Sequence, residues 1–240
     1  MTNLSRALNW EDLTILLPTK NEELSIKEVL EEIGSVSPNI HLLVADSSSD
    51  STPDLAKIAG AKIVSTPPRG KGYAVRVSLD YVHTPYVIMM NADLTYPATH
   101  IHLLYSCLTQ GYQAVVGYRF IVDKGAMSLL HSFGNAGLSL LASILYGHKV
   151  RDVCSGMWGF NTNILRGFPL RSDGFTLEAE LLVNTLSHKL EFAQVPIGYR
   201  KRGGDSRPKL KASDGLKIGT FLIKERFGRD NSGNNSRRMV

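Results

Sequence analysis

The chain alternates short apolar runs with polar or glycine-containing segments, and this alternation limits the possible folds more than any other feature. The run at 87–90 is uninterrupted, which is typical of a strand buried on both faces of a sheet. Similar runs at 13–17, 41–45, 61–65 and 114–117 alternate with segments of helical spacing. Strands that alternate with helices predict an α/β fold, a mostly parallel twisted sheet with helices on both faces.

A polar segment follows the run at 87–90 at once. Asn91, Ala92 and Asp93 come first, and Pro97 ends any regular structure. Open α/β sheets bind ligands at the carboxyl ends of their strands, and oxygen-rich groups there suit a hard divalent cation. Asn and Asp are also ordinary turn residues. From this segment alone, a ligand site and a plain turn are both open.

The length and composition are those of a globular protein. With 240 residues, 43% of them hydrophobic, the chain is long enough for one large domain, which we expect over residues 1–227. Cys107 and Cys154 lack the spacing of a metal or redox site, which favours a reduced, cytoplasmic protein. Residues 1–10 lack the apolar core of a signal peptide, so we expect no secretion.

The positive charge lies late in the chain. Residues 200–240 carry 12 basic and 4 acidic side chains, whereas the remainder carries 15 and 18. This asymmetry indicates an anionic partner such as a phosphate or a membrane surface. We expect no nucleic-acid partner, because no stacking aromatic residues are interleaved with the basic ones. Residues 228–240 have the composition of a disordered tail.

Two segments have the character of helices that contact lipid. Residues 125–148 contain no Asp, Glu, Lys or Arg, but their Ser, Asn and Gly residues make the segment too polar for a clear membrane span. A helix packed on the core and a helix in the membrane interface both fit. Residues 214–227 predict a basic helix that either rests on anionic lipid or docks on the domain.

Four segments, including 91–93, fall where a doubly wound sheet brings its loops to one edge. They are 18–23, 46–52, 69–72 and 91–93. In this order and spacing they resemble the family 2 glycosyltransferases of the GT-A (Rossmann-like) fold, most closely the polyprenyl-phosphate (dolichol-phosphate) hexosyltransferases. The resemblance covers residues 13–227 and includes later elements at 117–119, 152–156, 174–181 and 195–206.

The resemblance implies a role for each matching residue. Nucleotide-sugar contacts are expected from Pro18, Asn21, Glu22, Asp46, Lys71, Asn91, Ala92 and Asp93. Mg²⁺ or Mn²⁺ would be held by Asp93, Asn91 and Thr95. Acceptor or phosphate contacts are expected from Arg119, Ser155, Arg202, Ser206 and Lys209. The catalytic residues would be Asp93, Arg119 and Arg202.

The sequence departs from the family pattern at two positions. Ala45 stands where the second block commonly has an aspartate, and Asn91 stands at the first position of the Asp-x-Asp metal motif. Asparagine offers a carbonyl oxygen without a charge, so we predict weaker metal binding than in the common motif.

The expected activity is inverting transfer of a hexose from a GDP or UDP sugar to a polyprenyl phosphate. We expect a protein peripheral to the cytoplasmic face of a membrane, without its own anchor, which a partner membrane protein could supply. One alternative is a glycosyltransferase with a glycan or soluble hydroxyl acceptor, for which Glu178 and Glu180 are candidate bases. A second alternative is a non-catalytic subunit that binds nucleotide sugar or lipid.

Overall fold

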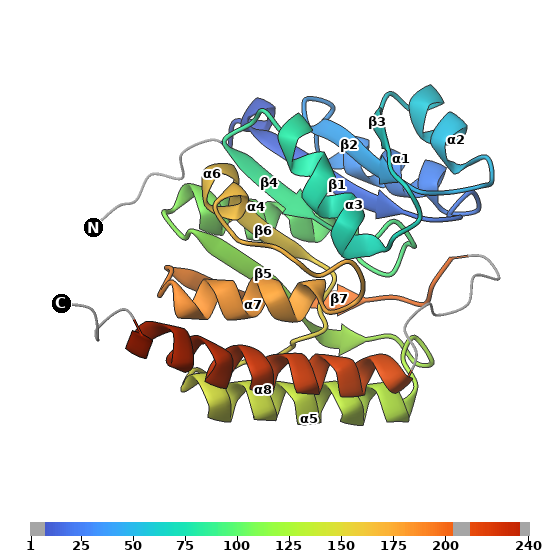
Figure 1. Ribbon diagram of the computed structural model, residues 1–240. Coiled ribbons are helices and arrows are strands. Elements are labelled where there is room, and N and C mark those ends of the chain that lie inside the picture. Colours follow the sequence, from blue (N-terminus) through green and yellow to red (C-terminus); the bar gives the residue numbers. More distant parts are fainter. Residues whose placement is uncertain (1–7, 204–211, 236–240) are drawn as a thin grey trace, which may run out of the picture.

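A single seven-stranded sheet forms the centre of the computed structural model, which describes residues 8–203 and 212–235 (Figure 1). Its strand order is β3-β2-β1-β4-β6-β5-β7. All strand pairs are parallel except the two that β6 makes with β4 and β5. The strands are β1 Leu13–Thr19, β2 His41–Asp46, β3 Lys62–Ser65, β4 Tyr86–Met89, β5 Ala114–Val122, β6 Trp158–Asn161 and β7 Phe192–Tyr199. The predicted α/β fold is therefore confirmed.

Helices cover both faces of this sheet. They are α1 Ile26–Val36, α2 Thr52–Ile58, α3 Lys71–Ser78, α4 Ile101–Thr109, α5 Leu129–Tyr146, α6 Thr162–Arg166, α7 Leu177–Ser187 and α8 Ala212–Asn235, with the short 3₁₀ turns η1 Trp10–Asp12, η2 Leu79–Tyr81 and η3 Ala98–His100. One apolar core joins the sheet to α1, α2 and α4, and a second joins it to α3, α7 and α8. Alternate residues of β1 supply both cores, since Leu16 faces one and Ile15 and Leu17 face the other.

The parallel register explains where the polar segments lie. Thr19 at the end of β1 pairs with Asp46 at the end of β2, and Leu16 pairs with Met89 of β4. The loops that follow these three strands therefore leave the sheet at the same edge. This edge is where an open α/β sheet binds its ligands.

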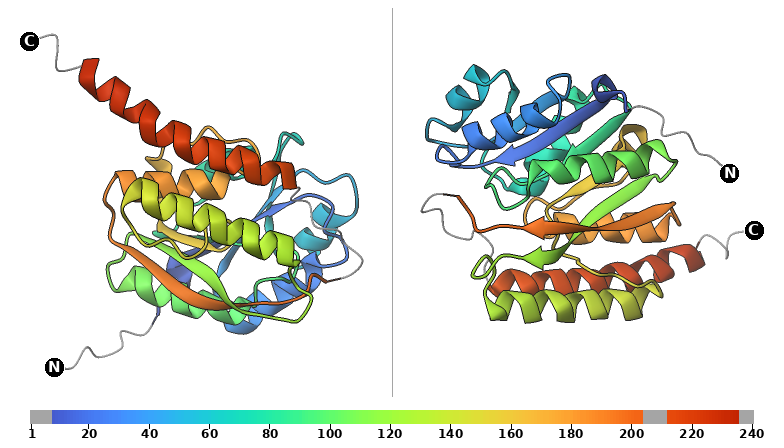
Figure 2. Two further views of the ribbon diagram at one scale, coloured as in Figure 1. Left: turned by 90° about the horizontal axis from the view of Figure 1, so that it is seen from below. Right: turned by 180° about the vertical axis from the view of Figure 1, so that it is seen from behind.

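Two long helices, α5 and α8, lie side by side on the flank of the domain far from β1–β3 (Figures 1 and 2). Leu138 and Leu141 of α5 pack around Gly219 of α8. Farther along, the Arg226 guanidinium donates to the carbonyl oxygen of Leu145. The two helices thus run in the same direction. Among the described residues, α5 is the one helix long and apolar enough to span a membrane, and only 11% of it is buried.

Two sequence predictions need correction. The last helix was expected over 214–227, but α8 runs from Ala212 to Asn235. Gly228 lowers helix propensity by about 1 kcal/mol without removing a backbone hydrogen bond, which does not suffice to end a helix. The strand expected at 114–117 continues to Val122, because β7 pairs with β5 along this extension.

Candidate active site

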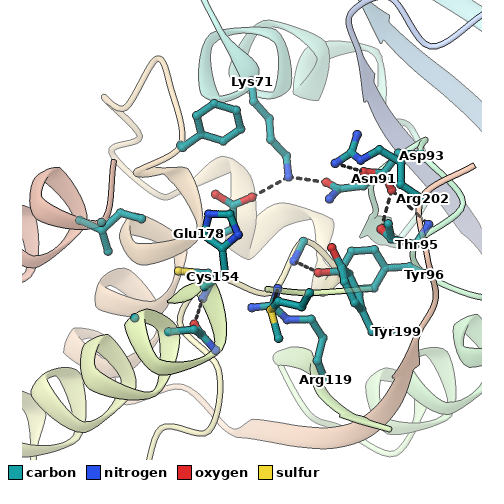
Figure 3. A pocket seen from close by; sticks show the side chains of 18 of the residues that line it. Lys71, Asn91, Asp93, Thr95, Tyr96, Arg119, Cys154, Glu178, Tyr199 and Arg202 are labelled. Atoms are coloured by element: carbon teal, nitrogen blue, oxygen red, sulfur yellow. Dashed lines mark hydrogen bonds and ion pairs between the residues drawn. The ribbon is translucent and has the colours of Figure 1, made fainter. Parts of the chain in front are cut away.

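One large cavity of about 1230 Å³ opens at the sheet edge where β1 and β4 end (Figure 3). Its lining has a polar arm, built by the loops after β1 and β4 and the start of α3. An apolar arm is built by α5 and α8. Predicted site residues that line the cavity are Pro18, Asn21, Glu22, Lys71, Asn91, Ala92, Asp93, Thr95, Arg119 and Arg202. The cavity thus gathers residues as far apart in the sequence as Pro18 and Arg202.

The buried carboxylate of Asp93 is held from two sides. Its Oδ1 accepts from the Thr95 hydroxyl at 2.5 Å and from the Thr95 backbone N–H at 3.2 Å. Its Oδ2 lies 2.7 Å from Nη2 of Arg202, whose Nη1 is 3.9 Å from the Glu22 carboxylate. Arg202 thereby ties the loop after β1 to the loop after β4.

Lys71, the first residue of α3, forms a second ion pair in the polar arm (Figure 3). Its Nζ donates to Oε1 of Glu178 at 2.5 Å and to Oδ1 of Asn91 at 2.7 Å. Glu178 lies in the first turn of α7, where the helix dipole favours a negative charge. The Lys71 and Glu178 side chains are only 13% and 8% exposed, so little water reaches this pair.

The glycines on each side of Lys71 have a packing role. Gly70 has a φ of +129°, and a Cβ at Gly70 or Gly72 would overlap the backbone at Ser172 and Asp173. The Asp173 carboxylate also accepts from Arg69 at 2.9 Å and from Arg76 at 2.7 Å. Hydrogen bonds from both arginines lower the pKa of Asp173. The Gly-Lys-Gly loop is therefore clamped to the segment that leads into α7.

Arg119 is bound to a carboxylate within the protein. Its Nε and Nη2 both donate to Asp152 at 2.7 Å, and the Arg119 side chain is 9% exposed. Burial opposes the charged guanidinium, but Tyr96 and Asp152 more than offset it and hold the pKa of Arg119 well above its usual value. Arg119 still lines the cavity, next to Tyr96 and Tyr199 (Figure 3).

Two predicted contact residues lie behind the cavity wall. Asp46 is buried, is not among the residues that line this cavity, and accepts from the Thr19 hydroxyl at 2.7 Å and the Ser48 hydroxyl at 2.6 Å. Ser155 is buried and donates to the carbonyl oxygen of Gly117. Both residues brace loops of the site. Ser206 and Lys209 lie outside the described residues.

Glu180, one of the two candidate bases, is also occupied in the fold. Its carboxylate accepts from the backbone N–H groups of Arg171 at 2.7 Å and Ser172 at 3.0 Å. Glu180 does not contribute to the cavity lining, whereas Glu178 does. Of the two, only Glu178 lines the cavity, and it is paired with Lys71.

The sequence analysis predicted lipid-contacting helices at 125–148 and 214–227 but did not predict that they line a cavity. Leu130, Phe133, Leu138 and Leu141 line it from α5, and Leu216 and Ile218 line it from α8. At Gly134 and Gly137, which also line it, a Cβ would meet nothing within 4 Å. The arm therefore has apolar walls and unfilled space.

Several lining residues escaped the sequence analysis. Tyr96, Tyr199 and Phe175 line the cavity without belonging to any predicted set. Cys154 lines it as well, and burial raises the pKa of its thiol to about 12. The signal available was position in the sequence, since Tyr199, Phe175 and Cys154 lie within the segments 195–206, 174–181 and 152–156, and Tyr96 closely follows 91–93. Position in a segment does not tell which side chain faces the cavity.

A divalent cation fits this donor set only in part. Asp93 and Thr95 offer oxygen ligands of the kind that Mg²⁺ and Mn²⁺ prefer. The Asn91 carbonyl oxygen, however, already accepts from Lys71. In residues 8–203 and 212–235 there is no group of three His, Cys, Asp or Glu side chains that could hold a metal ion. A cation at Asp93 therefore needs further oxygen ligands from a bound molecule.

Residues 14–168 match the family model described as Glycosyl transferase family 2. The chain belongs to this family. It is a glycosyltransferase of the GT-A fold, as the sequence predicted. Its relatives include glycosyltransferase AglJ of Haloferax volcanii, which is 33% identical over 92% of this chain and 72% of that protein. The dolichyl-phosphate hexose transferase of the same organism is 31% identical over 90% of this chain and 94% of its own length.

A solved structure agrees with this assignment. Glucosyl-3-phosphoglycerate synthase from Mycobacterium tuberculosis, in complex with Mn²⁺, UDP-glucose and phosphoglyceric acid, superposes with a TM-score of 0.72 and 25% identity. The match covers 90% of this chain and 79% of that one.

Proposed function

We propose that this glycosyltransferase transfers a hexose from a nucleotide sugar, of the GDP-mannose or UDP-glucose type, to a polyprenyl phosphate with inversion at the sugar. The observation that carries the proposal is the continuous cavity with one polar and one apolar arm. A nucleotide sugar is charged and water-soluble, whereas a polyprenyl phosphate joins a charged head to a long apolar chain. The two arms match these two substrates.

The polar arm suits the donor. Lys71 and Arg202 both line it and can bind phosphate oxygens, because ammonium and guanidinium groups form strong charge-assisted hydrogen bonds. A divalent cation bound with the nucleotide at Asp93 would neutralise the diphosphate leaving group. UDP-glucose and Mn²⁺ in the structure of the mycobacterial relative support a donor and cation of this class.

The chemistry needs no protein base when the acceptor is a phosphate. An oxygen of the lipid phosphate forms the new bond to the anomeric carbon, and the bond from that carbon to the diphosphate breaks. A phosphomonoester has a second pKa of about 6, so its oxygen is already ionised at neutral pH. The pairing of Glu178 with Lys71 agrees with a reaction that does not use Glu178 as a base.

The apolar arm suits the first isoprene units of the acceptor, and the outer surface of the same helices suits the membrane. Leu140 and Ile144 of α5 and Phe227 of α8 are 63%, 71% and 58% exposed. Exposed lysines 149, 217 and 224 lie near them in sequence, as expected for contact with anionic lipid. We place the protein at the cytoplasmic face of a membrane, as a peripheral protein that a membrane partner could anchor.

Transfer from labelled donors tests this function. UDP- and GDP-hexoses labelled in the sugar are incubated with a short polyprenyl phosphate and with Mg²⁺ or Mn²⁺, and the products are extracted into organic solvent. We expect label in the organic phase with wild type, and about a thousandfold slower labelling with Asp93→Asn. Label that never enters the organic phase with any donor would refute the lipid acceptor.

A soluble acceptor is the second candidate, favoured by the likeness to glucosyl-3-phosphoglycerate synthase. A sugar or glycerate hydroxyl is protonated, so transfer of the hexose to it requires a base. Glu178 is the candidate base in the cavity. Glu178→Gln should abolish transfer to a hydroxyl but only weaken transfer to a phosphate. Binding of a nucleotide sugar without turnover on any acceptor would instead favour a non-catalytic subunit.

A further inference from the structure

We propose that Lys71 is a fixed cation that binds the donor diphosphate, and that Asn91 holds Lys71 in place and is not a metal ligand. The inference rests on the donor half of the proposed function and is independent of the acceptor. It changes the assignment made from the sequence, in which Asn91 is the first residue of a metal motif.

The first argument is the contact that Asn91 makes. Its Oδ1, the only side-chain atom of Asn91 able to bind a cation, lies 2.7 Å from Nζ of Lys71. Metal binding there would place a divalent ion next to an ammonium group in a site of low water access. Asp93 differs, because its carboxylate carries a negative charge and about four lone-pair sites, so it can bind a cation in addition to Arg202 and Thr95.

The second argument is the remaining donor of Lys71. An ammonium group has three N–H bonds, and two of them point to Asn91 and Glu178. Within the described part of the chain, the third has no acceptor, and Lys71 lines the polar arm of the cavity. A phosphate oxygen in this arm can accept the third hydrogen bond of the Lys71 ammonium group.

The third argument is rigidity. The tight contact of Gly70 and Gly72 with the backbone at Ser172 and Asp173 fixes the main chain on both sides of Lys71. The Tyr73 backbone N–H also donates to the Asp173 carbonyl oxygen at 3.2 Å. Glu178 and Asn91 then fix the ammonium end. A preorganised charge stabilises a diphosphate without the cost of ordering a free lysine.

Two binding measurements separate the roles of these residues. The first is the affinity for UDP and for GDP in EDTA, measured by titration calorimetry. The second is the affinity of Mn²⁺ for the enzyme–nucleotide complex, measured from the electron paramagnetic resonance signal of free Mn²⁺. Neither measurement uses an acceptor, so failure of the lipid assignment does not affect them.

We expect Lys71→Met to weaken metal-free binding of the preferred nucleoside diphosphate by about ten- to a hundredfold, the value of a charge-assisted hydrogen bond. Lys71→Arg, which keeps the charge, should restore most of this loss. Lys27→Met removes the same charge at a side chain that is 70% exposed and should change nothing. A folded Lys71→Met variant that binds as tightly as wild type would overturn the proposal.

The Asn91→Ala variant supplies an independent test. We expect weaker metal-free nucleotide binding, because Lys71 loses a holding group, and unchanged Mn²⁺ affinity of the nucleotide complex. Asp93→Asn should give the opposite pattern, with Mn²⁺ affinity reduced. If Asn91→Ala weakens Mn²⁺ binding as Asp93→Asn does, Asn91 is a metal ligand and the proposal is wrong. If wild type binds neither UDP nor GDP, the donor assignment itself fails.

Discussion

The two arms of the cavity differ in how their side chains are held. In the polar arm, Lys71, Asp93 and Arg202 are fixed by ion pairs of 2.5 to 2.7 Å and are mostly buried. In the apolar arm, Phe133 and Leu130 of α5 are 74% and 69% exposed, although they line the same cavity. The polar arm is therefore preorganised for a small charged ligand. The apolar arm is open, and under the proposed function a membrane would cover its open side.

The largest expected effect lies in the polar arm, at Asp93. Asp93→Asn removes the carboxylate that pairs with Arg202 and that would bind a cation. Charge stabilisation of the leaving group contributes several kcal/mol, so we expect kcat/KM to fall about a thousandfold. Steady-state transfer of labelled hexose measures this, with Asp54→Asn, an exposed position on α2, as control. Activity within a few-fold of wild type would remove Asp93 from the site.

Breaking the Arg119–Asp152 pair tests whether buried ion pairs stabilise the wall of the cavity. Asp152→Ala leaves the buried Arg119 guanidinium unpaired, which we expect to lower the free energy of unfolding by about 3–5 kcal/mol. Urea denaturation measures the change. Asp173→Ala, which breaks more exposed pairs, should cost much less. An equal loss of unfolding free energy in the two variants would mean that the buried Arg119–Asp152 pair stabilises the fold no more than the exposed pairs of Asp173.

Substitutions on the outer surface of α5 test whether the apolar arm lies against a membrane. Leu140→Asp or Ile144→Asp places a charge on an exposed apolar position. Burial of one such side chain in lipid contributes about 1.5–3 kcal/mol, so each variant should bind anionic vesicles about ten- to a hundredfold more weakly. Flotation with vesicles measures the bound fraction. Ile58→Asp is the matched control, because Ile58 is 84% exposed on α2, far from α5 and α8.

The sequence predicted the sheet and its ligand edge because these depend on local patterns. Apolar runs identify buried strands, and Asn91 to Asp93 directly follow one of them. The sequence did not predict that Asp46 and Ser155 lie behind the cavity wall. A motif gives the residue type and its loop, whereas burial depends on how neighbouring loops pack.

The sequence also did not predict ion pairs between residues that lie far apart in the chain. Glu178 is 107 positions from Lys71, and nothing in the spacing indicates that the two pair. The uncharged segment 125–148 was recognised as a helix with two possible environments. Its contact with α8 and its share in the cavity come from tertiary packing, which periodicity alone does not specify.

The central claim is that the apolar arm holds the chain of a lipid acceptor, and Gly134→Leu tests it most directly. A Cβ at Gly134 meets nothing within 4 Å, so the leucine can fill the arm, and leucine favours a helix more than glycine does. Gly34→Leu makes the same change in α1 with equal room. The measurement is kcat/KM for a long polyprenyl phosphate and for a short water-soluble phosphate acceptor.

We expect Gly134→Leu to lower kcat/KM for the long acceptor by about ten- to a hundredfold, the usual penalty for overfilling an apolar site. The short acceptor should be used as well as by wild type, and Gly34→Leu should leave both values unchanged. An equal loss for both acceptors, or no loss for either, would contradict a lipid-binding arm between α5 and α8.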